Sequence, residues 1–331
     1  MRRPVLVGDI GGTNARFAMA DPGERRPRLR HMKTLPTSDF ASLQQAASHY
    51  LASVDASPEQ AAIAVASPVR DDDIRLTNRA WSFNRQDLVR ALDIEQLQII
   101  NDFGAAARAV AALEPDEFET LHGDDRRLQP PISVIGPGTG MGMALLADCP
   151  ANRWRVIETE GGHISYAPLG SEEQKIHEWL SARHDRVSVE RVLSGSGLSK
   201  IHAALSGLPA SKRDTDDAAL RPPADIVAAA LAGDDRLARA TLARFCAILG
   251  SVAGDAALIH GAHTVAITGG IVPRFIPFLK SSAFRERFLD KGRFAAHLEN
   301  VHIIVVTHPD PGLLGAALSI MPSGHNEYPD T

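Results

Sequence analysis

The chain has 331 residues, of which 44% are hydrophobic and 23% charged, and its formal net charge is −5. This composition is typical of an ordinary soluble protein with two modest domains, and it excludes a fibre or a nucleic-acid partner that needs excess basic charge. The two cysteines lack metal-ligand spacing and fit the cytoplasm, and no apolar run reaches membrane-spanning length.

Residues 5–21 are predicted to form two strands joined by a glycine turn. Two adjacent glycines let the backbone bring its N–H groups close to an anion, and the side chains that follow add donors. Asp9 ends the first strand, where its carboxylate could hold Mg²⁺ through water. The pattern predicts a turn that binds nucleotide phosphates, although a plain hairpin would have the same sequence pattern. The residues of the predicted phosphate turn are Gly8, Asp9, Ile10, Gly11, Gly12, Thr13 and Asn14.

Strands and helices are then expected to alternate. A strand at residues 28–33 precedes a helix capped by Ser38 or Asp39, with Phe40 on its apolar face. Strands at residues 61–66 and 97–100 flank a helix that begins after Ser82 or Asn84. A helix follows the second of these strands, up to about residue 112.

Residues 132–148 repeat residues 5–21 almost position for position. The second glycine turn contains Gly138, Thr139 and Gly140, so two hairpins could grip one phosphate chain. A Rossmann motif is excluded because a strand follows this turn where that motif needs a helix. A Walker loop is absent, since no glycine is followed by Lys and then Ser or Thr.

The second half of the chain is expected to contain most of the helical residues. Residues 212–223 are polar and predict an exposed loop, and apolar side chains from Leu237 to Val252 recur at helical spacing. A strand at residues 264–268 ends in the pair Gly269 and Gly270. Residues 301–306 form a last strand, a helix begins at residue 312, and the tail after residue 321 is expected to be loose.

Several acids and one histidine are candidates for chemistry. Asp102 follows a strand end and could act as a general base, although capping the next helix is a common role for Asp and the favoured one from the residues alone. Glu160 and His163 flank a glycine pair, and with Glu190 they could read sugar hydroxyls. A metal site or a solvated ion pair remains open for these three residues from the pattern alone.

The segments described above occur in an order that resembles bacterial glucokinases of the hexokinase type, within the actin, heat-shock ATPase and sugar kinase superfamily. The resemblance runs from Asp9 to Gly315 and is carried by residues 8–16, 76–78 with Trp81, 99–103, 138–142, 160–163, 190–195, 268–275 and 311–315. It implies a two-lobed α/β fold of the actin-like ATPase (ribonuclease H-like) type, with a duplicated β-hairpin/α-helix core and a cleft between the lobes. We expect a small domain of residues 1–112 and 303–321, a large domain of residues 113–302 and a loose tail of residues 322–331.

The resemblance implies ATP-dependent phosphorylation of D-glucose at the 6-hydroxyl, feeding glycolysis, with Asp102 accepting the hydroxyl proton. ATP and Mg²⁺ would be the cofactors, and Gly269 and Gly270 would border the adenosine. Relatives are commonly dimers, so a cytoplasmic homodimer is expected. The implied glucose contacts are Asn101, Asp102, Glu160, His163 and Glu190, with Asn78 close by.

Two alternatives remain. The residues that would bind sugar hydroxyls do not determine which hexose epimer is the substrate, so the substrate could be another hexose. A non-catalytic sugar-binding regulator is the second alternative, but no DNA-binding extension is expected ahead of Asp9. The cysteine-rich zinc signature of a related branch is absent. A kinase must also exclude water from the activated phosphate, which predicts closure of the lobes over bound sugar.

Overall fold

The structure is a computed structural model that describes residues 3–23, 26–67, 69, 71–75, 81–123, 128–149, 153–210 and 219–321. The chain divides into two compact units, which are described separately. The first comprises Met1–Glu114, Leu146–Glu158 and His308–Thr331, and the second comprises Pro115–Leu145 and Thr159–Thr307. Asn78, the tail 322–331 and most of the expected loop 212–223 lie outside the described residues.

A five-stranded sheet forms the centre of the first unit, in the order β3-β2-β1-β4-β7. β1 pairs antiparallel with β2 and parallel with β4, and β4 pairs parallel with β7. Ile10 pairs with Val65, and Val65 pairs with Asn101, so these three strands end at one edge of the sheet. The strands are β1 (Val5–Ile10), β2 (Asn14–Asp21), β3 (Arg28–Pro36), β4 (Gln60–Val65) and β7 (Gln96–Asn101).

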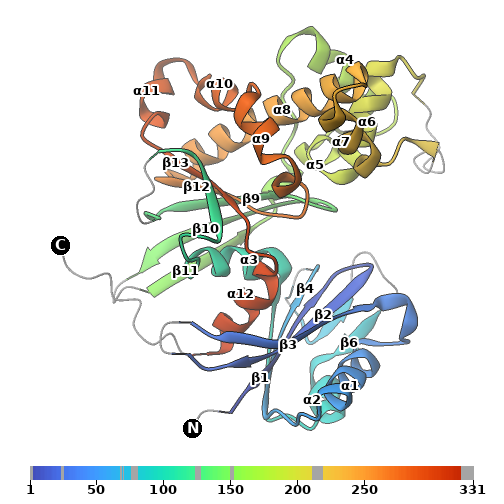
Figure 1. The fold of residues 1–331 in the computed structure, drawn as a ribbon, viewed down its shortest axis with the longest axis vertical. Coiled ribbons are helices and arrows are strands. Elements are labelled where there is room, and N and C mark those ends of the chain that lie inside the picture. The colour runs from blue at the N-terminus through green and yellow to red at the C-terminus, as the bar shows by residue number, and fades with distance from the viewer. Residues whose placement is uncertain are drawn as a thin grey trace. The chain divides into compact units, whose positions relative to one another are not determined.

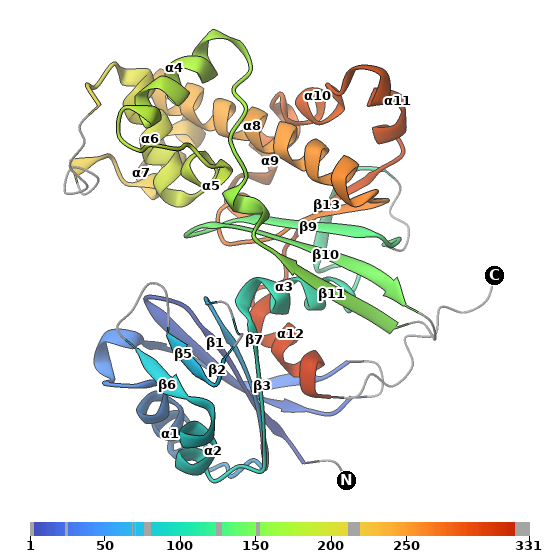
Figure 2. The ribbon, with the colours of Figure 1, turned by 180° about the vertical axis from the view of Figure 1, so that it is seen from behind.

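Helices cover both faces of this sheet (Figures 1 and 2). Successive side chains of β1 point to opposite faces, so Leu6 and Ile10 join the core under α1 (Leu43–Val54) and α2 (Arg85–Leu92). Val5 and Val7 face α3 (Asp102–Val110) and α12 (Pro311–Ile320). A short hairpin of β5 (Asp73–Arg75) and β6 (Ser82–Asn84) also belongs to this unit.

Two helix starts test the predicted caps. Asn84 caps α2 as expected, with its side chain accepting a hydrogen bond from the Gln86 amide. The expected cap at Ser38 or Asp39 is wrong: Ser42 caps α1 by accepting from the Gln45 amide. The reason is that Thr37–Asp39 forms a separate 3₁₀ turn, η1, and Phe40 is extended after it.

A six-stranded sheet has the order β11-β10-β9-β12-β13-β8. Its strands β8, β9, β12 and β13 belong to the second unit, whereas residues 146–158, at the end of β10 and in β11, were expected in the large domain but are assigned to the first unit. Its first five strands repeat the order of the first sheet, hairpin first and parallel strands after it, as the sequence repeat predicted. Residues 303–306 were expected in the first domain, but β13 pairs with β12 in this sheet. The strands are β8 (Phe118–His122), β9 (Ile132–Pro137), β10 (Met141–Cys149), β11 (Arg153–Thr159), β12 (Thr264–Ile267) and β13 (His302–Val306).

Most of the described helical residues lie in the second unit, as expected. The predicted apolar helix is confirmed as α8 (Arg236–His260), which Asp235 caps. α8 is long and apolar enough to cross a membrane by length and composition, which the sequence analysis did not foresee, but it is mostly buried in the core. The other helices are α4 (Gly170–Ser181), α5 (Val189–Val192), α6 (Gly195–Ser206), α7 (Pro223–Ala232), α9 (Ile276–Ser281), α10 (Phe284–Leu289) and α11 (Ala295–Leu298), with the 3₁₀ turns η2 (Gly161–His163), η4 (Val272–Phe275) and η5 (Gly292–Phe294).

Candidate active site

Asp9 lies in a small charge cluster at the carboxyl edge of the first sheet. Arg16 pairs with Asp9 across the hairpin, and its Nη1 donates to Asp9 Oδ2 at 3.2 Å. Arg16 Nε also lies 3.8 Å from Asp310 Oδ1, just before α12. Burial raises the pKa of Asp9, Arg16 acts in the opposite direction, and the Asp310 carboxylate raises it further. A Cβ on Gly312 would lie 2.8 Å from the Asp9 carboxylate, so a larger residue near the start of α12 would displace that carboxylate.

The predicted phosphate turn is held by a residue that the sequence analysis missed. The Gly11 amide donates to the Asn14 carbonyl at 3.0 Å, which closes the turn. The buried Thr37 hydroxyl lies within hydrogen-bond distance of the Gly12 and Thr13 carbonyls, at 2.9 and 3.0 Å. Thr37 follows β3, so its place at the turn depends on strand pairing and not on local sequence.

Gly8 and Ile10, two members of that predicted turn, have structural roles in the core. A Cβ on Gly8 would lie 2.8 Å from the Ile63 side chain, and the Ile10 side chain is fully buried. Any contact of Ile10 with a phosphate would therefore come from its backbone.

Asp102 begins α3 without being its cap. Asn101 is the cap, because its Oδ1 accepts from the amides of Phe103 and Gly104 at 2.9 and 3.0 Å. Burial raises the pKa of Asp102 to about 6, and the charges of Asp9 and Glu158 add to this effect. A half-buried carboxylate with a pKa near neutrality suits a general base, which must be ionised yet able to hold a proton.

Glu158 on β11 is a second residue that the sequence analysis did not identify. Its carboxylate lies against Gly104, at a place where the Cβ of any other residue would collide with it. Arg108 follows one turn later on α3; burial lowers its pKa, and the Glu158 charge opposes that shift. No local pattern marks Glu158, because its contact with α3 is made across a long sequence separation.

The three residues of the second unit that are predicted to bind sugar hydroxyls, Glu160, His163 and Glu190, lie close together. His163 Nε2 is 3.9 Å from Glu160 Oε2, and His163 Nδ1 is 4.0 Å from Glu190 Oε1. Glu190 Oε2 also accepts from the Met141 amide at 2.9 Å, which fixes its carboxylate at the start of β10. Glu160 and His163 are exposed and Glu190 is partly exposed, so their polar ends are accessible to a ligand.

The glycine pair between Glu160 and His163 is required by close packing. A Cβ on Gly161 would collide with the Met143 side chain, and one on Gly162 would collide with the Met141 carbonyl. The turn η2 therefore lies directly on β10, and the two glycines set where Glu160 and His163 project.

The other two predicted glycine turns are neighbours within the second unit. The Gly138 amide donates to the Gly140 carbonyl at 2.8 Å, and the Gly195 amide donates to the Gly138 carbonyl at 2.9 Å. Gly269 has a φ of 96° and lies so near the Pro137 carbonyl that a Cβ would approach it to 2.6 Å. Gly270 has open space around its Cα, as a site for a flat base or ribose would need.

The donor set at Asp9 fits Mg²⁺ bound largely through water and phosphate. Among the described residues, no group of three or more acids, histidines or cysteines could hold a metal ion. Two carboxylates, Asp9 and Asp310, nevertheless flank Arg16. Mg²⁺ keeps several waters and commonly takes one or two carboxylates together with substrate phosphates, so a complete protein cage is not required.

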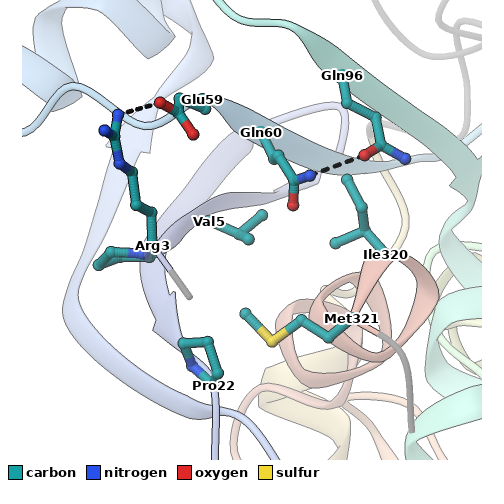
Figure 3. Close-up of a pocket in the computed structure, with 9 residues that line it drawn as sticks. Arg3, Val5, Pro22, Glu59, Gln60, Gln96, Ile320 and Met321 are labelled. Carbon is teal, nitrogen blue, oxygen red and sulfur yellow. Dashed lines mark hydrogen bonds and ion pairs between the residues drawn. The ribbon is translucent and has the colours of Figure 1, made fainter. Parts of the chain in front are cut away.

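A pocket of about 360 Å³ lies at the opposite edge of the first sheet, where β1, β4 and β7 begin (Figure 3). Arg3 pairs with Glu59 there, and Gln60 donates to Gln96 at 2.8 Å. Because Asp9 and Asn101 lie at the other ends of these strands, this pocket is separate from the candidate catalytic groups.

Comparison with known proteins gives a consistent result over nearly the whole chain. A family model described as Glucokinase matches residues 6–322. The chain is 42% identical over 329 residues to the glucokinase of Chromohalobacter salexigens, which covers 99% of each protein. The solved glucokinase of an Antarctic psychrotroph is 36% identical, with a TM-score of 0.82 and coverage of 97% of this chain and 99% of that one.

A more distant solved structure agrees in fold. The ROK family glucokinase from Streptomyces griseus, in complex with glucose and AMPPNP, is 19% identical with a TM-score of 0.64 and covers 96% of this chain and 98% of that one. At this identity the likeness concerns the fold alone. Together with the repeated sheet order, these structures confirm the expected α/β fold of the actin-like ATPase type.

Proposed function

The chain belongs to the glucokinase family, and we propose that it transfers the terminal phosphoryl group of ATP to the 6-hydroxyl of D-glucose. The 42% identity to a curated glucokinase over nearly the full length supports ATP-dependent phosphorylation of glucose. The observation that carries the residue-level proposal is Asp102, a half-buried carboxylate at a strand end whose pKa is raised to about 6.

Asp102 would serve as the general base. Its carboxylate would accept the proton of the 6-hydroxyl while that oxygen attacks the terminal phosphorus and the bond to ADP breaks. Asn101, Glu160, His163 and Glu190 would bind the sugar hydroxyls, since amides, carboxylates and imidazoles offer directional donors and acceptors. Asn78, which lies outside the described residues, is proposed as a further residue close to the sugar.

The glycine turns would hold the nucleotide. Backbone amides of the turns at residues 8–14 and 138–140 would face the phosphates, and Gly269 and Gly270 would border the adenosine. Mg²⁺, held through water by Asp9 with Asp310 nearby, would neutralise phosphate charge. The Streptomyces griseus structure, which shares the fold, was solved with glucose and AMPPNP, so this fold can hold that pair of ligands.

We place the enzyme in the cytoplasm as a homodimer that supplies glucose 6-phosphate to glycolysis. The support is the family membership, together with two cysteines that lack metal-ligand spacing. Neither nucleic acid nor a membrane is proposed as a partner.

A coupled assay for ADP release tests this function. Purified protein with ATP and Mg²⁺ is given glucose, fructose, mannose or glucosamine in turn, and Asp102→Ala is assayed beside it. We expect release that depends on glucose and falls by about 10²-fold or more in the variant. Equal rates in both proteins would contradict the base assignment, and a preference for another hexose would contradict glucose as the substrate.

A further inference from the structure

Glu173 on α4 is a fully buried carboxylate at the centre of a hydrogen-bond network in the second unit. Arg287 Nη1 donates to its Oε1 at 2.6 Å and Arg244 Nη1 at 3.2 Å. On the other oxygen, the Tyr166 hydroxyl and the Leu169 amide each donate at 2.9 Å, and Arg287 Nη2 donates at 3.3 Å. One carboxylate thereby joins α4, α8, α10 and the segment that precedes α4.

The network keeps Glu173 ionised. Burial alone would raise its pKa, but hydrogen bonds from Arg287, Leu169 and Tyr166 together hold the pKa below its usual value. A buried ionic cluster is a weak source of stability, because its desolvation offsets much of the attraction. What this cluster does provide is fixed geometry for the groups that it binds, because both oxygens of Glu173 accept several hydrogen bonds.

Two of the groups that Glu173 binds belong to the short segment between His163 and α4. That segment forms a ladder with the residues that lead to Glu190. The Tyr166 amide donates to the Val187 carbonyl at 3.0 Å, and the Val189 amide donates to the Ile164 carbonyl at 2.9 Å. Ser165 and Ser188 form the bridge between them.

The ladder has a candidate sugar-binding residue at the end of each of its two segments. His163 directly precedes Ile164, and Glu190 directly follows Val189. Arg186 adds a further tie by donating to the His163 carbonyl at 2.6 Å. A shift of the ladder would therefore move His163 and Glu190, whose facing atoms are 4.0 Å apart.

We propose that Glu173 is a positioning residue for sugar binding, acting through the Tyr166 hydroxyl on the ladder that holds His163 and Glu190. The proposal rests on the proposed function, in which those two residues bind glucose. Glu173 itself would touch neither sugar nor nucleotide, so its effect should appear in sugar affinity and not in the phosphoryl-transfer step.

Tyr166→Phe is the decisive variant, because it removes only the hydroxyl and keeps the buried ring. We expect the KM for glucose to rise by about 5-fold, which is less than for loss of a direct hydrogen bond to a charged group because the effect reaches the sugar only through the ladder, with kcat and the KM for ATP within about 2-fold of wild type. Glu173→Gln should raise the KM for glucose further. Glu172→Gln is the matched control: this neighbour is 54% exposed, also pairs with Arg244, and should leave all constants unchanged.

Hydrogen exchange gives a second measurement that does not need turnover. Tyr166→Phe and Glu173→Gln should lower protection of the backbone amides at positions 166 and 189, and Glu172→Gln should not. An unchanged KM for glucose in folded Tyr166→Phe, or a matching fall in kcat, would overturn the proposal, and so would unchanged exchange at both amides. Failure of the proposed function would appear differently, as wild-type protein that does not phosphorylate glucose; exchange alone would then decide whether Glu173 holds the ladder.

Discussion

The raised pKa of Asp102 has three causes: burial, the Asp9 carboxylate and the Glu158 carboxylate. A carboxylate that acts as a general base must be ionised to accept a proton, so it is active at a pH above its pKa. With a pKa of about 6, Asp102 would be active at neutral pH and would lose activity as the pH falls through 6. The like charge of Glu158 makes this loss begin at a higher pH than it otherwise would.

The pH profile of kcat/KM for glucose tests that environment. Wild-type protein should lose activity with a single proton near pH 6, so that about one tenth of the plateau remains at pH 5. Glu158→Gln removes a like charge, lowers the pKa of Asp102 and should retain more of its plateau at pH 5. Glu172→Gln serves as the control, since it lies in the other unit and should keep the wild-type profile. Superimposable profiles for wild type and Glu158→Gln would contradict this account.

Residues that end a strand could be predicted from the sequence, and residues that reach a site by strand pairing could not. Asp9 and Asp102 were found because each lies at the end of an apolar run. Thr37 and Glu158 were missed because each meets its partner, the first glycine turn or Gly104, only after distant segments fold together. Local sequence carries no signal for such contacts.

At the scale of elements, small residues decide how closely helices approach the first sheet. The face under α3 and α12 contains Ala18, Ala20, Ala62 and Ala64, which leave room for both helices. Gly315 of α12 lies against the Ala105 carbonyl of α3, so closely that a Cβ would collide with it. The close neighbour of α12 is therefore α3, the helix that begins with Asp102.

Gly315→Ala should therefore destabilise the protein even though alanine favours helix. Because the collision is with backbone, the helices must move apart, and we expect a loss of about 1–3 kcal/mol in the free energy of unfolding. Ser319→Ala, on the same helix and only partly buried, should change that free energy by less than about 0.5 kcal/mol. Urea denaturation followed by circular dichroism measures both; equal midpoints would show that α12 relaxes without cost.

Caps and turns were predicted less well than the strands. The helix now labelled α1 was expected to begin near Ser38, but it begins after Ser42 because Thr37–Asp39 forms its own turn. That turn carries the Thr37 hydroxyl to the glycine turn, a tertiary interaction that local cap preferences cannot reveal. β8 was not foreseen either, and it extends the second sheet by antiparallel pairing with β13.

At the scale of the whole molecule, the duplicated sheet order is what the sequence repeat predicted. Each sheet has an antiparallel hairpin followed by parallel strands, and each places glycine turns at strand ends. The chain passes between the two units four times, at Glu114–Pro115, Leu145–Leu146, Glu158–Thr159 and Thr307–His308. The candidate base lies in the first unit, and Glu160, His163 and Glu190 lie in the second.

This division predicts that glucose draws the two units together. A kinase that left the activated phosphate open to water would hydrolyse ATP without phosphorylating the sugar. Closure over bound sugar prevents this wasteful hydrolysis. The radius of gyration from X-ray scattering should therefore fall when glucose is added. Glu190→Gln should require more glucose for the same compaction, because it weakens a proposed sugar contact, whereas Glu172→Gln should compact as wild type does. A radius that stays constant at saturating glucose would contradict closure while leaving the assignment of Asp102 intact, because base catalysis needs the carboxylate beside the hydroxyl and not a particular path to that state.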